Sequence, residues 1–193
     1  MSDVPAETKG QRTRRRILDA ARRVFGDVGY DRATIRAIAA AARVDKSSIN
    51  QYFGTKAELF AEAVRWQIPF DRLAGATAQE TVENHLRGML TAWAVDPYSP
   101  MAVLIRTSMT STEAADIFRD HIANEIIPAL AASMDAHDAR QRAALVSAVL
   151  MGVASQRYLL AVPDLVQLDV DDIMRLAAPA LHALVGGSTQ AES

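Results

Sequence analysis

A run of hydrogen-bonding side chains between residues 46 and 52 holds the residue types in this chain that best fit a chemical task. Each member can donate to a phosphate oxygen or to the edge of a base. In the same segment Val44, Ile49 and Phe53 form an apolar set, so a helix here would bury one side and expose donors on the other. A short helix of that kind fits the major groove of DNA. The donors are Lys46, Ser47, Ser48, Asn50, Gln51 and Tyr52.

A second helix is expected immediately before this one, after a three-residue break. Residues 35–42 place Ile and Ala at helical spacing. Thr34 can cap the first of the two helices, and the Asp45 carboxylate can accept from the free N–H groups that open the second. Residues 34–53 are therefore predicted to form a helix, a tight turn and a second helix.

The distribution of charge supports contact with nucleic acid better than the net charge of −2 does. Residues 1–56 hold 12 Lys and Arg against 6 Asp and Glu, a net of +6. The remaining residues hold 9 against 17, a net of −8. The basic part coincides with the predicted helix pair, while DNA would repel the acidic remainder.

Length and composition exclude several classes of protein. The 193 residues suffice for one large domain or two small ones, and the absence of cysteine excludes disulfides, thiolate metal sites and a cysteine nucleophile. The polar, basic N-terminus lacks the apolar run of a signal peptide. The apolar stretch between Arg142 and Arg157 is too short to span a membrane. We expect a cytoplasmic protein with no membrane partner.

The rest of the chain predicts helices and no strand. An apolar stripe runs from Thr13 to Val28, and threonine-to-glutamate capping signatures occur at Thr55–Glu58, Thr77–Glu80 and Thr110–Glu113. Further helices are expected over 78–95, 112–134, 138–163 and 169–184, with a kink at Pro128. The predicted fold is all-α, a three-helix N-terminal head with a larger C-terminal bundle. The expected divisions are a flexible basic arm (1–12), a helix-turn-helix domain (13–56), a ligand-binding and dimerisation domain (57–187) and a disordered tail (188–193).

Two helical faces near the C-terminus are suited to close packing. Ala144, Ala148 and Gly152 leave a shallow lane along one helix, and the last helix has an apolar stripe from Ile173 to Leu184. Either the interior of a single bundle or a dimer interface accounts for these patterns. A helix-turn-helix protein commonly pairs two reading helices across a palindrome, which favours the dimer.

The segment from Thr13 to Val64 strongly resembles the N-terminal domain of the TetR family of bacterial transcriptional regulators. The resemblance implies a homodimer, a C-terminal ligand-binding domain of five or six helices, and usually repression relieved by a small molecule. The shared residues are Ile17-Leu-Asp-Ala-Ala, Phe25, Gly29-Tyr30, Thr34, Ile38-Ala39, Val44, Lys46, Tyr52-Phe53 and Lys56-Ala-Glu58-Leu59.

By position, this resemblance assigns Lys46, Tyr52 and Lys56 to DNA phosphates, with Thr34 as a further backbone contact. Ser47, Ser48, Asn50 and Gln51 occupy the variable positions that face base edges. The two amides can each pair with adenine in a bidentate manner. Arg12, Arg14, Arg15 and Arg16 fit either phosphate and minor-groove contacts or a solubilising arm.

The chain departs from the family pattern at two positions. Arg43 stands at the turn position that glycine usually holds, and a left-handed conformation there would cost a side chain about 1 kcal/mol. Asn50 stands where members usually have tyrosine. Both departures make the operator sequence unpredictable from relatives.

Candidates for an effector site come from the C-terminal helices. Polar groups in an apolar pocket can orient a ligand, although the same residues also serve as ordinary core. His121 and Glu125 are one helical turn apart, but two ligands are too few for a metal site, and neither a metal nor a cofactor is expected. The candidates are His85, Met89, Trp93, Ile105, Phe118, His121 and Tyr158.

The sequence contains no catalytic motif for hydrolases, phosphate-loop enzymes or zinc proteases. We therefore expect a ligand-responsive DNA-binding regulator, most simply a repressor that binds a palindromic operator as a dimer. An activator or a ligand-independent regulator of the same fold is the nearest alternative. A helical small-molecule carrier is the alternative from a different class.

Overall fold

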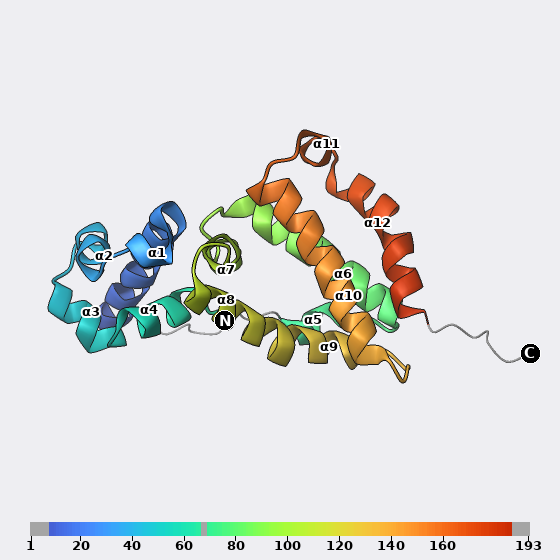
Figure 1. The fold of residues 1–193 in the computed structure, drawn as a ribbon, viewed down its shortest axis with the longest axis horizontal. Coiled ribbons are helices and arrows are strands. Elements are labelled where there is room, and N and C mark those ends of the chain that lie inside the picture. The colour runs from blue at the N-terminus through green and yellow to red at the C-terminus, as the bar shows by residue number, and fades with distance from the viewer. Residues whose placement is uncertain (1–7, 67–68, 187–193) are drawn as a thin grey trace, which may run out of the picture. The chain divides into compact units, whose positions relative to one another are not determined.

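The computed structural model describes residues 8–66 and 69–186, and the described residues are helical with no strand. The predicted tail, residues 188–193, lies outside them. Figure 1 shows the order of the helices. They are α1 (Lys9–Arg32), α2 (Ile35–Ala42), α3 (Lys46–Phe53), α4 (Lys56–Ala63), α5 (Phe70–Leu73), α6 (Ala78–Val95), α7 (Pro100–Ser108), α8 (Thr112–His121), α9 (Ile127–Ala131), α10 (Ala139–Ala154), α11 (Pro163–Val166) and α12 (Val170–Val185).

The chain divides into two compact units. Among the described residues, 8–66 and 98–117 form the head unit, and 69–97 and 118–186 form the body unit. The head unit therefore includes α4 and α7 as well as the helix-turn-helix. This discontinuous unit differs from the boundary expected between residues 56 and 57, because α7 packs on α1.

The helix α1 is longer than the sequence pattern predicted. Thr8 and Gln11 form a reciprocal capping box, so residues 9–12 are helical and the predicted flexible arm is wrong for them. Residues 1–7 of that arm lie outside the described residues. Near its other end α1 is interrupted at Gly29, whose φ of 80° and ψ of 166° are accessible mainly to glycine.

An aromatic cluster fills the centre of the head unit. Phe25 and Tyr30 of α1 meet Phe60 of α4 with ring centroids 4.8 to 5.8 Å apart. Phe25 and Phe60 are fully buried. The core continues into α2, α3 and α7 through Ile38, Ile49 and Leu104. The apolar stripes that predicted these helices are thus the faces that hold them together.

The body unit packs α6 against both α10 and α12, and α10 also packs against α9 and α12 (Figure 1). Arg142 of α10 fixes the end of α12 by donating to the carbonyl oxygens of Leu184 at 2.9 Å and Gly186 at 3.2 Å. Its Nε also donates to Asp138 Oδ1 at 2.6 Å, and this contact lowers the pKa of the Asp138 carboxyl. Asp169 caps the start of α12, as the sequence predicted.

Pro128 lies where the sequence predicted a kink, and a π-helical segment precedes it there. Residues Ile122–Ile126 form a π-helical segment between α8 and α9, in which Ile127 N–H bonds to the Ile122 carbonyl. A proline has no N–H, so in this spacing it leaves the Ala123 carbonyl unbonded. Arg140 Nη2 donates to that carbonyl at 3.0 Å. A second π-helical segment, Ser155–Leu159, follows α10.

Candidate nucleic-acid interface

The helix α3 presents the polar face that its sequence predicts. Ile49 is fully buried and Phe53 nearly so, which fixes the inward side of the helix. On the other side the donors are exposed, with Ser48 half-buried and Tyr52 39% exposed. The free polar face can meet a groove without unfolding any part of the head unit. The exposed donors are Lys46, Ser47, Asn50, Gln51 and Tyr52.

Asp45 occupies the predicted N-cap position immediately before α3 but does not cap the helix with its side chain. The structure shows no side-chain hydrogen bond from Asp45 to the helix N-terminus, so this expectation is wrong. Thr34, by contrast, caps α2 as predicted by accepting from Ala37 N–H at 3.1 Å. Thr34 is exposed, so it remains on the surface beside the helix pair.

The turn between α2 and α3 contains a residue in a conformation that is strained for any residue other than glycine. Arg43 has φ 53° and ψ 51°, the left-handed region that favours glycine. The turn closes through Arg43 N–H to the Ala40 carbonyl and Val44 N–H to the Ala39 carbonyl, at 3.1 and 3.0 Å. Arg43 thus ends α2 in the left-handed conformation, at the position that glycine usually holds in the family.

Lys56 opens α4 and interacts with the end of α1. Its Nζ lies 4.4 Å from the centroid of the Tyr30 ring and donates to the Asp31 carbonyl at 3.3 Å. An ammonium group has three donors, so these contacts orient the side chain and leave capacity for a phosphate. The α4 N-terminus itself is held by the predicted capping box between Thr55 and Glu58. The Thr55 bonds lower the pKa of the Glu58 carboxyl.

Two of the N-terminal arginines are bound within the head unit. Arg14 Nη2 donates to Glu62 Oε1 at 2.8 Å, and the Arg14 guanidinium lies 5.2 Å from the centroid of the Phe53 ring. Arg16 Nη2 donates to the carbonyl oxygens of Ala42 and Arg43. The solubilising arm that the sequence left open is therefore wrong for these two residues. Sequence reasoning missed their partners, because those lie 48 residues away for Arg14 and 26 for Arg16.

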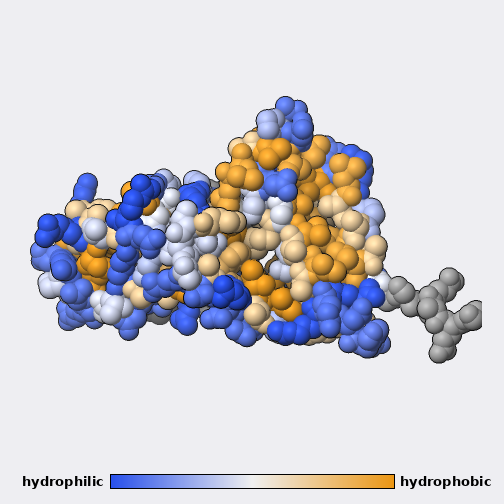
Figure 2. Space-filling view, in the orientation of Figure 1, coloured by the Kyte–Doolittle hydropathy of each residue, from blue (hydrophilic) through white to orange (hydrophobic). Residues whose placement is uncertain are grey.

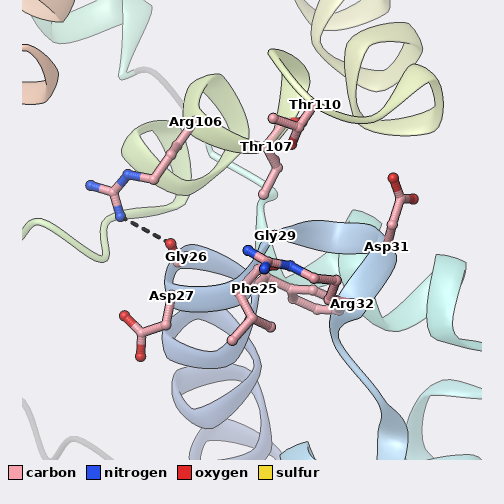
Figure 3. A pocket seen from close by; sticks show the side chains of 10 residues that line it. Phe25, Gly26, Asp27, Gly29, Asp31, Arg32, Arg106, Thr107 and Thr110 are labelled. Carbon is pink, nitrogen blue, oxygen red and sulfur yellow. Dashed lines mark hydrogen bonds between the residues drawn. The ribbon is translucent and has the colours of Figure 1, made fainter.

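A pocket of about 450 Å³ lies in the head unit where α1 is interrupted (Figure 3). Arg106 of α7 donates to the Gly26 carbonyl at 3.4 Å, the contact dashed in the figure, and Arg32 donates to the Val28 carbonyl at 2.9 Å. Both guanidinium groups thus satisfy carbonyls near the end of α1. Asp27 and Asp31 also line the pocket, so its charged residues balance.

The predicted effector-lining residues fall in both units. Ile105 lies in α7 of the head unit and is 1% exposed, whereas the other candidates belong to the body unit. The Tyr158 hydroxyl donates to the Leu90 carbonyl at 2.6 Å. The remaining candidates are His85 and Met89, buried on α6, Phe118 and His121, half-buried on α8, and Trp93, which is on α6 but whose side chain lies outside the described part of the structure.

His85 is the buried ionisable candidate. Its Nδ1 lies 2.7 Å from the Thr81 carbonyl, which assigns the ring proton to Nδ1 and leaves Nε2 as the acceptor of the neutral ring. Burial lowers the pKa of His85 below its ordinary value, and the bond to Thr81 opposes that shift. The ring is therefore neutral near pH 7.

His121 Nδ1 and Glu125 Oε2 are 3.3 Å apart. Within 8–66 and 69–186, no three histidine or carboxylate side chains come together as metal ligands would. In the same part of the chain, every helix is too short or too polar to cross a bilayer.

Comparison with known protein families decides which fold family this arrangement represents. Residues 17–63 match the profile of the bacterial regulatory proteins of the tetR family. Residues 79–185, more than half of the chain, match the tetracyclin repressor-like C-terminal domain. The chain belongs to the TetR family. The second match lies outside Thr13–Val64, the segment whose sequence resembles the family.

Proteins similar to this TetR-family chain include transcriptional repressors and regulators of solved structure. It is 37% identical over 79 residues to the HTH-type transcriptional repressor Rv1474c of Mycobacterium tuberculosis, and this alignment covers 41% of each chain. The alignment with the HTH-type repressor AcnR of Corynebacterium glutamicum is 33% identical and covers 45% of each. The chain thus spans less than half the length of these relatives.

Solved structures extend the similarity to more than nine tenths of the chain. A TetR-family regulator from Streptomyces coelicolor is 29% identical with a TM-score of 0.67, covering 93% of this chain and 98% of that one. NalD of Pseudomonas aeruginosa, at 16% identity and a TM-score of 0.73, covers 95% of this chain and 100% of its own, and shows the shared fold alone.

Proposed function

We propose that this TetR-family protein is a transcriptional repressor that binds a palindromic operator as a homodimer and is released by a small hydrophobic molecule. The observation that supports DNA binding most directly is the exposed polar face of α3. In this assignment Lys46, Tyr52 and Lys56, with Thr34, hold phosphates. Ser47, Ser48, Asn50 and Gln51 face base edges. The site of action is the bacterial cytoplasm, where the DNA is, and the proposal includes no catalytic activity.

The proposed dimer forms through α10 and α12. Leu145 and Val149 of α10 are 55% and 36% exposed, and Leu176 of α12 is 58% exposed. An added side chain at Gly152 would meet nothing within 4 Å, so the lane along α10 is open. Figure 2 shows hydrophobic residues gathered over these helices. A pair of such bodies would present two α3 helices to successive major grooves, about 34–36 Å apart.

The effector is proposed to bind in the body unit. His121 immediately precedes one π-helical segment and Tyr158 lies inside the other. Such segments often occur at functional sites because they displace side chains from regular helical positions. Buried His85 and Met89 on α6 add a polar acceptor and a deformable apolar surface. A ligand lowers operator occupancy only if it binds more tightly to the conformation that cannot bind DNA. Each increment of about 1.4 kcal/mol in that difference in binding free energy would lower occupancy tenfold.

An electrophoretic mobility shift assay tests the proposal. The full-length protein is first incubated with duplexes from its own upstream region and with genomic fragments, and the bound DNA is sequenced. A palindromic sequence bound by a dimer is the expected result. Failure to retain any DNA would overturn the proposal and favour the carrier function.

The same assay is then repeated with cell extracts and fractionated lipophilic compounds. Release by one fraction supports ligand response. A complex that no fraction changes would favour ligand-independent regulation. Transcription from the selected promoter in the presence and absence of the protein separates repression from activation.

A further inference from the structure

The α1 helix contacts the structure at both ends of the DNA-reading helix α3 through two arginines. Arg16 reaches the turn that precedes α3, where its Nη2 lies 3.0 Å from the Ala42 carbonyl and 3.3 Å from the Arg43 carbonyl. Arg14, half a helical turn away on α1, contacts Phe53, the last residue of α3. Neither arginine resembles a disordered cationic arm, because each has partners in the fold.

The Arg16 contact falls on the strained residue of the turn. The left-handed conformation of Arg43 is unfavourable for any residue with a Cβ, and relaxation of φ to negative values would change the direction in which α3 leaves the turn. The guanidinium bonds the carbonyl of Ala42, the last residue of α2, and that of Arg43, which follows it, where the end of a helix leaves carbonyls without helical partners. A cation at that end of a helix is also favoured by the helix dipole.

The Arg14 contact holds the opposite end of α3 to α4. Its guanidinium pairs with Glu62 of α4 at 2.8 Å while lying 5.2 Å from the centroid of the Phe53 ring. The Phe53 side chain is 9% exposed, so this end of α3 is anchored in the core. The positive charge of Arg14 is therefore balanced by the Glu62 carboxylate of the same chain and does not require a DNA phosphate.

We propose that Arg14 and Arg16 are positioning residues that set the orientation of α3 for DNA, and that neither depends on a phosphate contact for its effect. The inference rests on the proposed DNA-binding function. It adds that, among the arginines at positions 12, 14, 15 and 16, those at 14 and 16 position α3. The rigid placement of α3 on the core is achieved by side chains of α1, which itself need not enter a groove.

The first test compares Arg16→Ala, Arg43→Gly and the double variant on an operator duplex selected with the wild-type protein. We expect Arg16→Ala to weaken binding about tenfold, because the turn loses its charged hydrogen bonds. Arg43→Gly in the same chain should restore binding to within about threefold of wild type, since glycine adopts the left-handed turn without penalty. The salt dependence should be unchanged in all three variants.

Lys46→Ala serves as the matched control for loss of a phosphate contact. Its slope of log affinity against log salt should fall by about one. If Arg16→Ala lowers the slope in the same way and Arg43→Gly does not restore binding, Arg16 is a phosphate contact and the proposal is wrong. Should Arg16→Ala alone fail to fold by circular dichroism, the comparison is made within the Arg43→Gly background, where Arg16→Ala should cost less than about threefold.

The second test uses Glu62→Gln, which removes the partner of Arg14 without removing a positive charge. A positioning role predicts weaker operator binding. A phosphate-binding role for Arg14 predicts tighter binding, because a negative charge is lost and the guanidinium is released. Asp19→Asn on α1 is the control for the change in net charge, and it should leave affinity within about twofold.

These outcomes are separable from failure of the proposed function. A wild-type protein that selects no DNA overturns DNA binding itself. A wild-type protein that binds its operator, together with Glu62→Gln binding more tightly, overturns only the positioning role.

Discussion

At the scale of single residues, the proposed interface gives Gln51 and Lys56 different partners, a base edge for the first and a phosphate for the second. Gln51 lies on the exposed face of α3, while Lys56 at the start of α4 is oriented by the Tyr30 ring and the Asp31 carbonyl. An amide can distinguish one base pair from another, whereas an ammonium attracts every phosphate equally. The two residues should therefore affect binding in different ways.

We predict that Lys56→Ala weakens all duplexes to a similar extent and reduces the salt slope by about one. Gln51→Ala should instead lose about 1–3 kcal/mol of discrimination at one base pair of each half-site. Competition binding with a panel of single-base operator variants measures both effects. Identical behaviour of the two variants would contradict the division between base and phosphate contacts.

His85 should make stability depend on pH. Its pKa is lowered in the fold by burial, so below about pH 6.5 the unfolded ring takes up a proton that the folded ring does not. The free energy of unfolding should therefore fall as the pH drops below that value. Urea denaturation between about pH 7 and about pH 5 should show a shallower decline for His85→Gln, which keeps an N–H donor but does not titrate. Parallel curves for wild type and His85→Gln would show that the buried ring is not responsible.

At the scale of the elements, sequence patterns found most helices but not every boundary. The Thr55–Glu58 capping box and the Asp169 cap are present as predicted. At the start of α8, however, Ser111 lies in the capping position, 3.5 Å from Ala114 N–H, while Thr110 donates to the Thr107 carbonyl. Thr110 and Ser111 both carry a hydroxyl that could cap α8, so the local sequence does not distinguish them. The way in which the chain leaves α7 determines which of the two hydroxyls takes that role.

Local sequence patterns also could not predict the contacts of Arg14 and Arg16 that orient the candidate interface. Periodicity predicted that Ile49 and Phe53 turn inward and so placed the polar face of α3 correctly. It carried no information on Arg14 and Arg16, whose partners come from other helices. Long polar side chains acquire roles only after packing brings distant segments together.

The end of α12 provides a test of one such long-range contact. Arg142→Ala removes the bonds to the Leu184 and Gly186 carbonyls and to Asp138, at a side chain that is 19% exposed. We expect the free energy of unfolding to fall by about 2 kcal/mol, measured by urea denaturation. The control is Arg175→Ala, whose pair with Asp172 is more exposed and should change stability by less than about 0.5 kcal/mol.

At the scale of the whole molecule, the proposed binding to a palindrome requires two copies of the chain joined as a dimer. Leu145 and Leu176 lie exposed on α10 and α12, where the proposed dimer would bury them. A glutamate at either position would place a charge in that interface. Loss of the dimer should reduce operator affinity although α3 is unchanged.

We predict that Leu145→Glu and Leu176→Glu shift the protein from dimer to monomer in analytical ultracentrifugation and weaken binding to the full palindrome. Binding to a single half-site should stay the same. Met109→Glu is the matched control, because Met109 is 77% exposed on the head unit. Variants that remain dimeric would place the interface elsewhere.

The discontinuous head unit has a consequence for dissecting the protein. The chain passes between the two units three times, near residues 67, 97 and 117, so a single proteolytic cut leaves them covalently tied. A fragment that stops at residue 66 would also lack α7, whose Met101, Leu104 and Ile105 are buried and whose helix packs on α1. The excised fragment would expose to water the face of α1 on which α7 packs. We expect such a fragment to aggregate during purification.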